Sequence, residues 1–185
     1  MRYDRLFPLA AFAFIAACSN TDTVTSPARV RLTAPRLAVT TIEDANAPSG
    51  THLQTGSIGC TVGSDLSVTC TSFELAGVGH TNADVSLVAN YTATILCSNK
   101  GVNPNNSIEP QTTSFSAGDT FTANSSKNGR LRVRDGVADP DASAAEDACP
   151  NPNWTADITG LTLVSFTYSV TFDGFTLPYI LITGP

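Results

Sequence analysis

The stretch Val164-Ser165-Phe166-Thr167-Tyr168-Ser169-Val170-Thr171-Phe172 decides the fold of this chain. Apolar residues recur at every second position with hydroxyl side chains between them, which is the pattern of a half-buried β-strand. Asp173-Gly174 follows, a pair typical of two-residue hairpin turns because the turn needs positive φ angles. The predicted hairpin sets apolar residues opposite each other in four pairs: Phe172 and Phe175, Val170 and Leu177, Tyr168 and Tyr179, Phe166 and Leu181.

Pro178 lies in the second strand of this predicted hairpin. Proline has no backbone N–H, so a strand tolerates it where no neighbouring strand pairs on that side. We therefore expect Phe175 to Thr183 to be an edge strand.

A second hairpin is predicted around Gly63-Ser64-Asp65, where apolar residues alternate on both sides of the turn. The register that sets Val62 opposite Val68 also sets Cys60 opposite Cys70, which predicts a disulfide between them. Phe73 and Leu75 then change the phase of the alternation, so we expect a bulge or bend near Ser72.

Further strands complete the prediction. Val85 to Cys97 alternates throughout, and Thr112–Ser116, Thr120–Ala123 and Arg130–Val133 are weaker candidates. Because no amphipathic helix of useful length is visible, we predict an all-β fold, an immunoglobulin-like β-sandwich of seven or eight short strands with two disulfides.

The N-terminal end has the pattern of an export signal. Arg2 and Arg5 precede an apolar run from Leu6 to Ala17, which is too short to span a membrane as a helix. The segment Ile15-Ala16-Ala17-Cys18 resembles the lipobox of bacterial lipoproteins, and this resemblance implies that Cys18 is acylated and becomes the mature N-terminus. Ser19 at the next position resembles lipoproteins that are sent to the outer membrane or cell surface.

The sequence predicts three segments: a signal peptide at 1–17, a disordered tether at 18–55 and a β-sandwich domain at 56–185. The tether is rich in Thr, Ser, Ala and Pro, and its roughly 37 residues would reach about 35 Å. Within it, 37–42 could add a strand to the domain. The chain has five cysteines, an odd number, and acylation of Cys18 leaves four for two disulfides in an oxidising compartment.

Charge excludes one class of partner. After residues 1–17, the chain has eight Lys and Arg residues against fifteen Asp and Glu residues, a net charge of about −7. A nucleic-acid-binding domain has the opposite balance, so no nucleic-acid partner is expected.

Several motifs together resemble a group of small secreted bacterial β proteins. The most specific is Cys149-Pro150-Asn151-Pro152-Asn153-Trp154-Thr155, and the others are Gly77-Val78-Gly79 with Asp84-Val85, Cys97-Ser98-Asn99 with Gly101 and Asn103, and Lys127-Asn128-Gly129-Arg130. The resemblance covers about half the chain, 77–164. It implies an exported β domain in which Cys97 pairs with Cys149, and it implies no activity.

This pairing would bring two polar segments together into a candidate binding patch of Asn99, Asn103, Asn151, Asn153 and Trp154. The asparagines offer donors and acceptors without a titrating group. Trp154 has two interpretations, either core packing over the disulfide or an anchor that stacks on a sugar ring or contacts a protein partner.

Catalytic motifs are absent from the sequence, which contains no Gly-x-Ser-x-Gly, no His-Glu-x-x-His and no phosphate-binding loop. His52 falls in the predicted tether and His80 in a turn, so neither is expected to be a catalytic base. Asp139, Asp141 and Glu146 are a possible calcium site, but a solvated acidic loop is the favoured interpretation, because the glycine that an EF-hand needs is replaced by Ala144. We expect no cofactor.

The sequence therefore favours a non-catalytic binding or structural module of the cell envelope. We expect this module to be attached to the membrane through its lipid and to recognise a protein or polysaccharide. The alternatives are a carbohydrate-binding module and a small secreted hydrolase.

Overall fold

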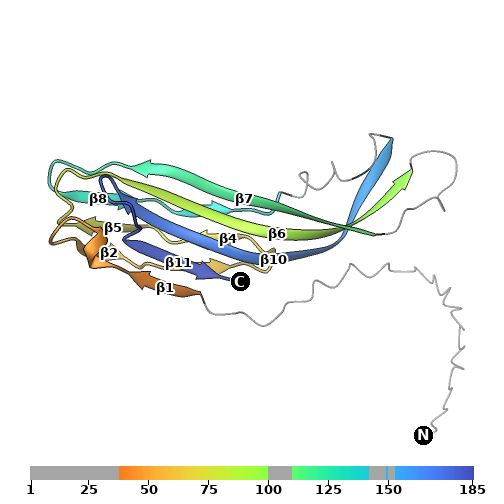
Figure 1. Cartoon of the computed structure of the whole chain (residues 1–185), viewed down its shortest axis with the longest axis horizontal. Helices are drawn as coiled ribbons and strands as arrows, with labels where there is room; N and C mark the ends of the chain where they lie inside the picture. The colour runs from red at the N-terminus through yellow and green to blue at the C-terminus, as the bar shows by residue number, and fades with distance from the viewer. Residues whose placement is uncertain (1–37, 100–109, 142–148, 150–152) are drawn as a thin grey trace, which may run out of the picture.

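The computed structural model describes residues 38–99, 110–141, 149 and 153–185, which form antiparallel β-sheets with one 3-10 turn at Asp44–Asn46 (Figure 1). Three strands are long: β6 (Ala83–Asn99), β7 (Gln111–Ala123) and β10 (Trp154–Phe172). The shorter strands are β1 (Val39–Ile42), β2 (His52–Gly56), β3 (Cys60–Val62), β4 (Val68–Cys70), β5 (Phe73–Ala76), β8 (Arg130–Val133), β9 (Gly136–Ala138) and β11 (Ile180–Gly184).

The strands form two layers. The larger layer is a five-stranded sheet in the order β1-β11-β10-β6-β7. The smaller layer consists of two three-stranded sheets, β2-β5-β8 and β3-β4-β9. Three stretches of the chain, here called passes, each contribute one strand to both of these sheets: β2 leads into β3, β4 into β5 and β8 into β9. All three passes are interrupted at the same level of the layer.

The described residues form eleven strands, more than the seven or eight short strands predicted, because the smaller layer is divided into two sheets. The all-β class and both disulfides are confirmed. The bend expected near Ser72 is also present, since β4 ends at Cys70 and β5 begins at Phe73. The likeness to the immunoglobulin fold is limited to the layered architecture. The strand order differs, because the first and last strands, β1 and β11, are neighbours in one sheet here.

The core lies between the two layers and is built by the alternating residues of both. In β6 every odd-numbered residue from Ala83 to Cys97 is buried. The smaller layer contributes Leu75, Leu131 and Val68 to the same cluster. The largest fully buried side chains come from β6 and β10: Tyr91, Tyr168, Phe166 and Phe172.

The predicted C-terminal hairpin is wrong in its register. A turn does form at Asp173-Gly174, where the Phe175 N–H donates to the Phe172 carbonyl oxygen at 3.0 Å. Pairing resumes only at Ile180, which lies opposite Val170, where Leu177 was expected. The residues between the turn and β11 leave the ladder, and the Pro178 carbonyl oxygen accepts a hydrogen bond from Asn46 Nδ2.

The prediction that Phe175 to Thr183 forms an edge strand is wrong as well. β11 pairs with β10 on one side and with β1 on the other, so β1 lies outside it. Pro178 needs no unpaired edge because it stands in the loop before β11. The sequence did not distinguish the two positions, because a loop and the outer side of an edge strand both accommodate a residue that has no backbone N–H.

The folded layers begin earlier than the sequence indicated, since β1 and all of β2 except Gly56 lie in the segment that was assigned to the tether. The possible strand at 37–42 corresponds to β1. All residues of β1 and β2 are exposed, so neither strand shows the alternation that marks a half-buried strand. Backbone pairing with β11 and β5 positions them instead. The signal segment 1–17, Cys18 and the rest of the tether to 37 lie outside the described residues.

Two buried tyrosines give a matched test of the core. Tyr91 Oη lies 3.0 Å from the Leu66 carbonyl oxygen and 3.2 Å from that of Ala138, and burial raises its pKa to about 12. The buried Tyr168 Oη has no hydrogen-bond partner among the described residues. We expect Tyr91→Phe to lower the free energy of unfolding by about 1–3 kcal/mol. Tyr168→Phe should leave it unchanged or raise it. Urea denaturation measures both, and equal losses would contradict this assignment.

Candidate functional site

The Cys97–Cys149 disulfide lies at one end of the molecule, where β6 and β10 extend beyond the smaller layer (Figure 1). The two Cα atoms are 5.8 Å apart. The pairing that the family resemblance implied is therefore confirmed. So is Cys60–Cys70, in the predicted register with Val62 opposite Val68.

Trp154 lies beside the Cys97–Cys149 disulfide. It begins β10 opposite Asn99, and its side chain is half-buried. It packs with Cys149 against a small apolar cluster that contains Ile95 and Cys97. The indole therefore covers the end of the β6–β10 ribbon and keeps part of its surface exposed, a position between the two interpretations that the sequence allowed.

The predicted asparagine patch is only partly described. Asn99 lies at the end of β6, and Asn153 is exposed one residue before β10. Asn103 and Asn151 lie outside the described residues. The structure thus brings the Asn99 backbone, Asn153, Trp154 and the disulfide to one end of the molecule.

Only part of the possible calcium site lies within the described residues. Asp139 and Asp141 are exposed after β9, and Glu146 lies outside the described residues. Within the part of the chain that the structure describes, no three His, Cys, Asp or Glu side chains are grouped to hold a metal ion. His52, in β2, and His80, in a turn, are both exposed.

A second candidate site, which the sequence analysis missed, lies on the outer side of the smaller layer. Leu131 and Val133 of β8 are buried in the core. Arg130, Arg132 and Arg134 alternate with them, so the three arginines project from the opposite side. The signal was the alternation Arg-Leu-Arg-Val-Arg, which predicted a strand but did not show what lies beside it.

Glu74 of the neighbouring strand β5 holds two of these arginines. Arg130 Nη1 donates to Glu74 Oε1 at 2.9 Å, and Arg132 Nε donates to Glu74 Oε2 at 2.8 Å. The Glu74 side chain is nearly buried, with 10% of its surface exposed. The hydrogen bond from Arg132 and the charge of Arg130 hold its pKa below the ordinary value, although burial opposes them. Glu74 is therefore a carboxylate at neutral pH.

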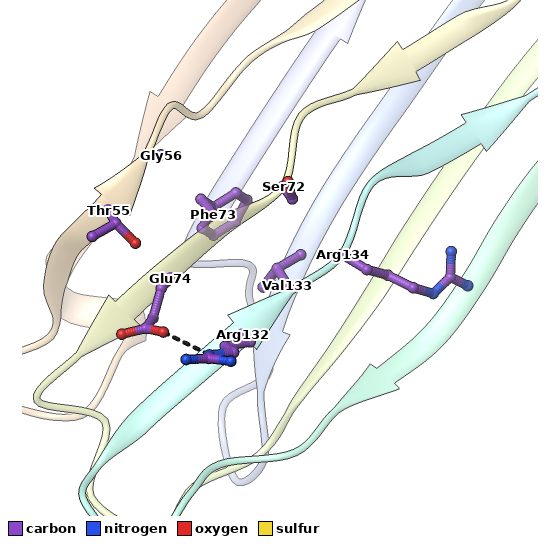
Figure 2. A pocket seen from close by; sticks show the side chains of 8 residues that line it. All are labelled: Thr55, Gly56, Ser72, Phe73, Glu74, Arg132, Val133 and Arg134. Atoms are coloured by element: carbon purple, nitrogen blue, oxygen red, sulfur yellow. Dashed lines mark hydrogen bonds and ion pairs between the residues drawn. The ribbon is translucent and has the colours of Figure 1, made fainter.

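A groove of about 510 Å³ opens next to this carboxylate, where the smaller layer is interrupted (Figure 2). Gly56 ends β2 on one side, Ser72 precedes β5, and Val133 ends β8 on the other side. The Arg132 side chain is 83% exposed at the groove. In the described part of the chain it makes one side-chain hydrogen bond, through Nε, so its two terminal nitrogens remain open to solvent.

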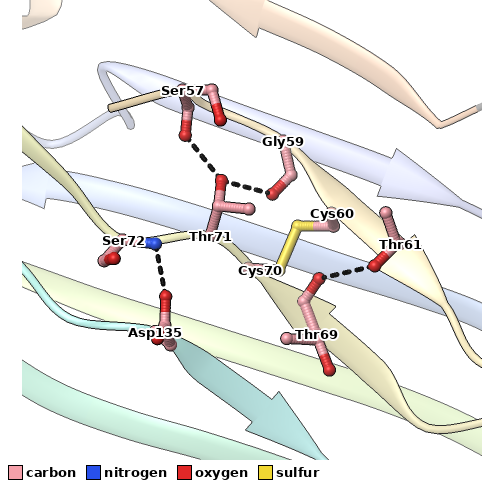
Figure 3. The surroundings of a disulfide bond; sticks show 9 residues. All are labelled: Ser57, Gly59, Cys60, Thr61, Thr69, Cys70, Thr71, Ser72 and Asp135. Carbon is pink, nitrogen blue, oxygen red and sulfur yellow. Dashed lines mark hydrogen bonds between the residues drawn. A yellow bond between two sulfur atoms is a disulfide. The ribbon is translucent and has the colours of Figure 1, made fainter. Parts of the chain in front are cut away.

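The interruption itself is bridged by specific hydrogen bonds beside the Cys60–Cys70 disulfide (Figure 3). The Thr71 hydroxyl donates to the carbonyl oxygens of Ser57 and Gly59. The Ser72 N–H donates to Asp135 Oδ1 at 2.6 Å. These bonds replace the missing ladder and hold the interruption together next to Gly56 and Ser72, which line the groove.

Arg134 lines one end of the groove but turns away from Glu74 (Figure 2). Its two terminal nitrogens donate to the Asp119 carboxylate at 2.7 and 2.9 Å, and its guanidinium lies 3.9 Å from the centre of the Phe121 ring. This pairing lowers the pKa of Asp119 and raises that of Arg134. Arg134 is thus occupied in joining β8 to β7.

The lowered pKa of Glu74 predicts a pH dependence of stability. Its contribution is complete above the ordinary value of 4.5 and is lost as the pH falls through the lower pKa of the folded state. We expect the stability difference between the wild-type protein and Glu74→Gln to shrink between about pH 5 and pH 2. Urea denaturation across this range measures it. Asp119 is present in both proteins and cancels, so a difference that does not vary with pH would contradict the assignment.

Comparison of the chain with protein-family models, curated proteins and solved structures finds no match. The site is therefore interpreted from its own residues. None of the described residues belongs to a helix long and apolar enough to cross a membrane.

Proposed function

We propose that this chain is an exported lipoprotein whose β domain is a non-catalytic binding module of the cell envelope. Acylated Cys18 anchors it, and Ser19 favours the outer membrane or cell surface. Two disulfides support export, because such bonds persist mainly in oxidising compartments.

The open groove beside Glu74 is the observation that carries the binding role. Its ionised groups include the exposed Arg132 side chain and the Glu74 carboxylate, whose lowered pKa keeps it charged at neutral pH. A general acid or base works best when its pKa lies near the working pH. Fixed charges on a pre-shaped surface suit recognition instead, because their orientation is settled before the ligand arrives.

The anchor is tested at Cys18. We expect the intact mass of membrane-extracted protein to exceed that of the chain from Cys18 by a diacylglyceryl group and a further acyl chain. Two or more acyl chains are needed for stable anchoring. Cys18→Ala should therefore appear in the soluble fraction. Unmodified wild-type protein with a different N-terminus would contradict the lipid anchor.

The non-catalytic role is tested with the full mature chain and purified envelope polysaccharides and peptides. We expect co-sedimentation with a polymer and no new products by mass spectrometry. Product release that disappears when one carboxylate is replaced would establish the hydrolase alternative.

A further inference from the structure

We propose that the groove beside Glu74 binds the carboxylate group of an acidic sugar, with Arg132 as the binding residue. This inference rests on the proposed function as a binding module and names the ligand class of its groove.

The charge distribution singles out this face. The whole chain has a net charge of −6. In the ranges that the structure describes, every Lys and Arg residue lies between Lys127 and Arg134. Among the described residues, the positive charge is therefore concentrated on β8 and the residues directly beside it. Such a concentration raises the local density of anions and directs them to that surface.

The arginines are pre-oriented by Glu74. Arg130 and Arg132 each give one nitrogen to its two carboxylate oxygens. The remaining donors of each planar guanidinium are partly or largely exposed, since 51% of the Arg130 side chain and 83% of the Arg132 side chain are accessible. A guanidinium edge matches the two oxygens of a carboxylate, which it binds through parallel hydrogen bonds.

The local balance of charge fits a single carboxylate. Two arginines against Glu74 leave one positive charge, and Arg134 is already neutralised by Asp119. Thr55 and Ser72 stand at the rim and supply hydroxyl groups, while the Phe73 ring is buried. The groove thus offers one guanidinium for a carboxylate and nearby hydroxyl groups that can hydrogen-bond to sugar hydroxyls. This combination suits a uronate sugar.

The test uses the full mature chain in detergent, with isothermal titration calorimetry of a galacturonate oligomer. The fully methyl-esterified oligomer keeps the hydroxyls and lacks the carboxylates, and polyglutamate has carboxylates without sugar hydroxyls. The variants are Arg132→Gln and Arg132→Lys. Lys127→Gln removes the same charge from the turn outside the groove and is the matched control. Thermal unfolding checks that each variant is folded.

We expect the wild-type protein to bind the acid oligomer at least about tenfold more tightly than its ester, as loss of a charge-assisted hydrogen-bond pair implies. Arg132→Gln should weaken binding by about tenfold, and Arg132→Lys should also weaken it because lysine lacks the fork. Lys127→Gln should stay within about twofold, as a charge outside the contact changes affinity little.

Three results would overturn the inference: no binding of the acid oligomer, equal binding of the ester or of polyglutamate, or an Arg132→Gln affinity equal to that of the wild-type protein. None of these results would contradict the proposed binding role, because the module could still bind another ligand. Cleavage of the oligomer would overturn that role itself, so the two failures are distinguishable.

Discussion

Replacing Ile182 with alanine is expected to lower the free energy of unfolding by about 2–5 kcal/mol, the usual cost of a large cavity in a core. Ile182 is fully buried and lies opposite Tyr168 in the β10–β11 ladder. It belongs to the same apolar cluster as Phe166 and Val170. The expected loss adds the free energy gained by burying the isoleucine side chain to the cost of the cavity that remains. Urea denaturation measures it.

Leu177→Ala is the matched control. Leu177 is 60% exposed in the loop before β11, so we expect its replacement to change the free energy of unfolding by less than about 0.5 kcal/mol. The hairpin predicted from the sequence pattern requires the reverse, because it places Leu177 opposite Val170 in the core. A larger loss for Leu177→Ala than for Ile182→Ala would therefore restore that hairpin and contradict the observed register.

Removal of the Cys97–Cys149 disulfide is the second change with a large expected effect. The bond closes a loop with a sequence separation of 52 residues, so replacing both cysteines with alanine should cost about 4 kcal/mol by the chain-entropy relation. Removal of Cys60–Cys70, with a separation of 10 residues, should cost about 3 kcal/mol. Each loss is a large fraction of the 5–15 kcal/mol that stabilises a typical domain.

The two disulfides should also differ in where their loss is felt. Cys97 and Cys149 pack with Trp154 and Ile158 in the small cluster at the end of the β6–β10 ribbon. Without this bond, amide hydrogen exchange should accelerate at 93–99 and 154–161 while β4 and β5 stay protected. Equal acceleration in β4 would show that the disulfide stabilises the domain as a whole, against this expectation.

The alternation of residues determined the strands that are buried on one side. β6 and the part of β10 from Val164 to Phe172 were predictable because period two is visible wherever one side of a strand faces the core. The first part of β10, from Trp154, was not predicted. Cys60–Cys70 was predictable for a related reason, since a short hairpin with matched apolar residues leaves few registers. The Cys97–Cys149 pair was implied only by the family resemblance.

Strands without a buried side do not show the alternating pattern, so 37–42 was only a possible strand and β2 was assigned to the tether. β1 and β2 are exposed along their whole length and are held by backbone hydrogen bonds, which any sequence can make. β11 was misplaced because Asp173-Gly174 and Pro178 fit two structures equally well. A tight hairpin and a turn followed by a loop place the same local demands on these residues, and core packing of Ile180 and Ile182 decides between them.

The groove was decided by the tertiary structure alone. Arg130 and Arg132 were visible as alternating charges, but Glu74 is 56 and 58 residues away from them in the chain. Only the β5–β8 pairing brings the three together. The sequence by itself determined a disulfide-braced β fold with an acidic character. Which strands became neighbours, and therefore where its few positive charges face an open groove, depended on long-range pairing that local patterns do not encode.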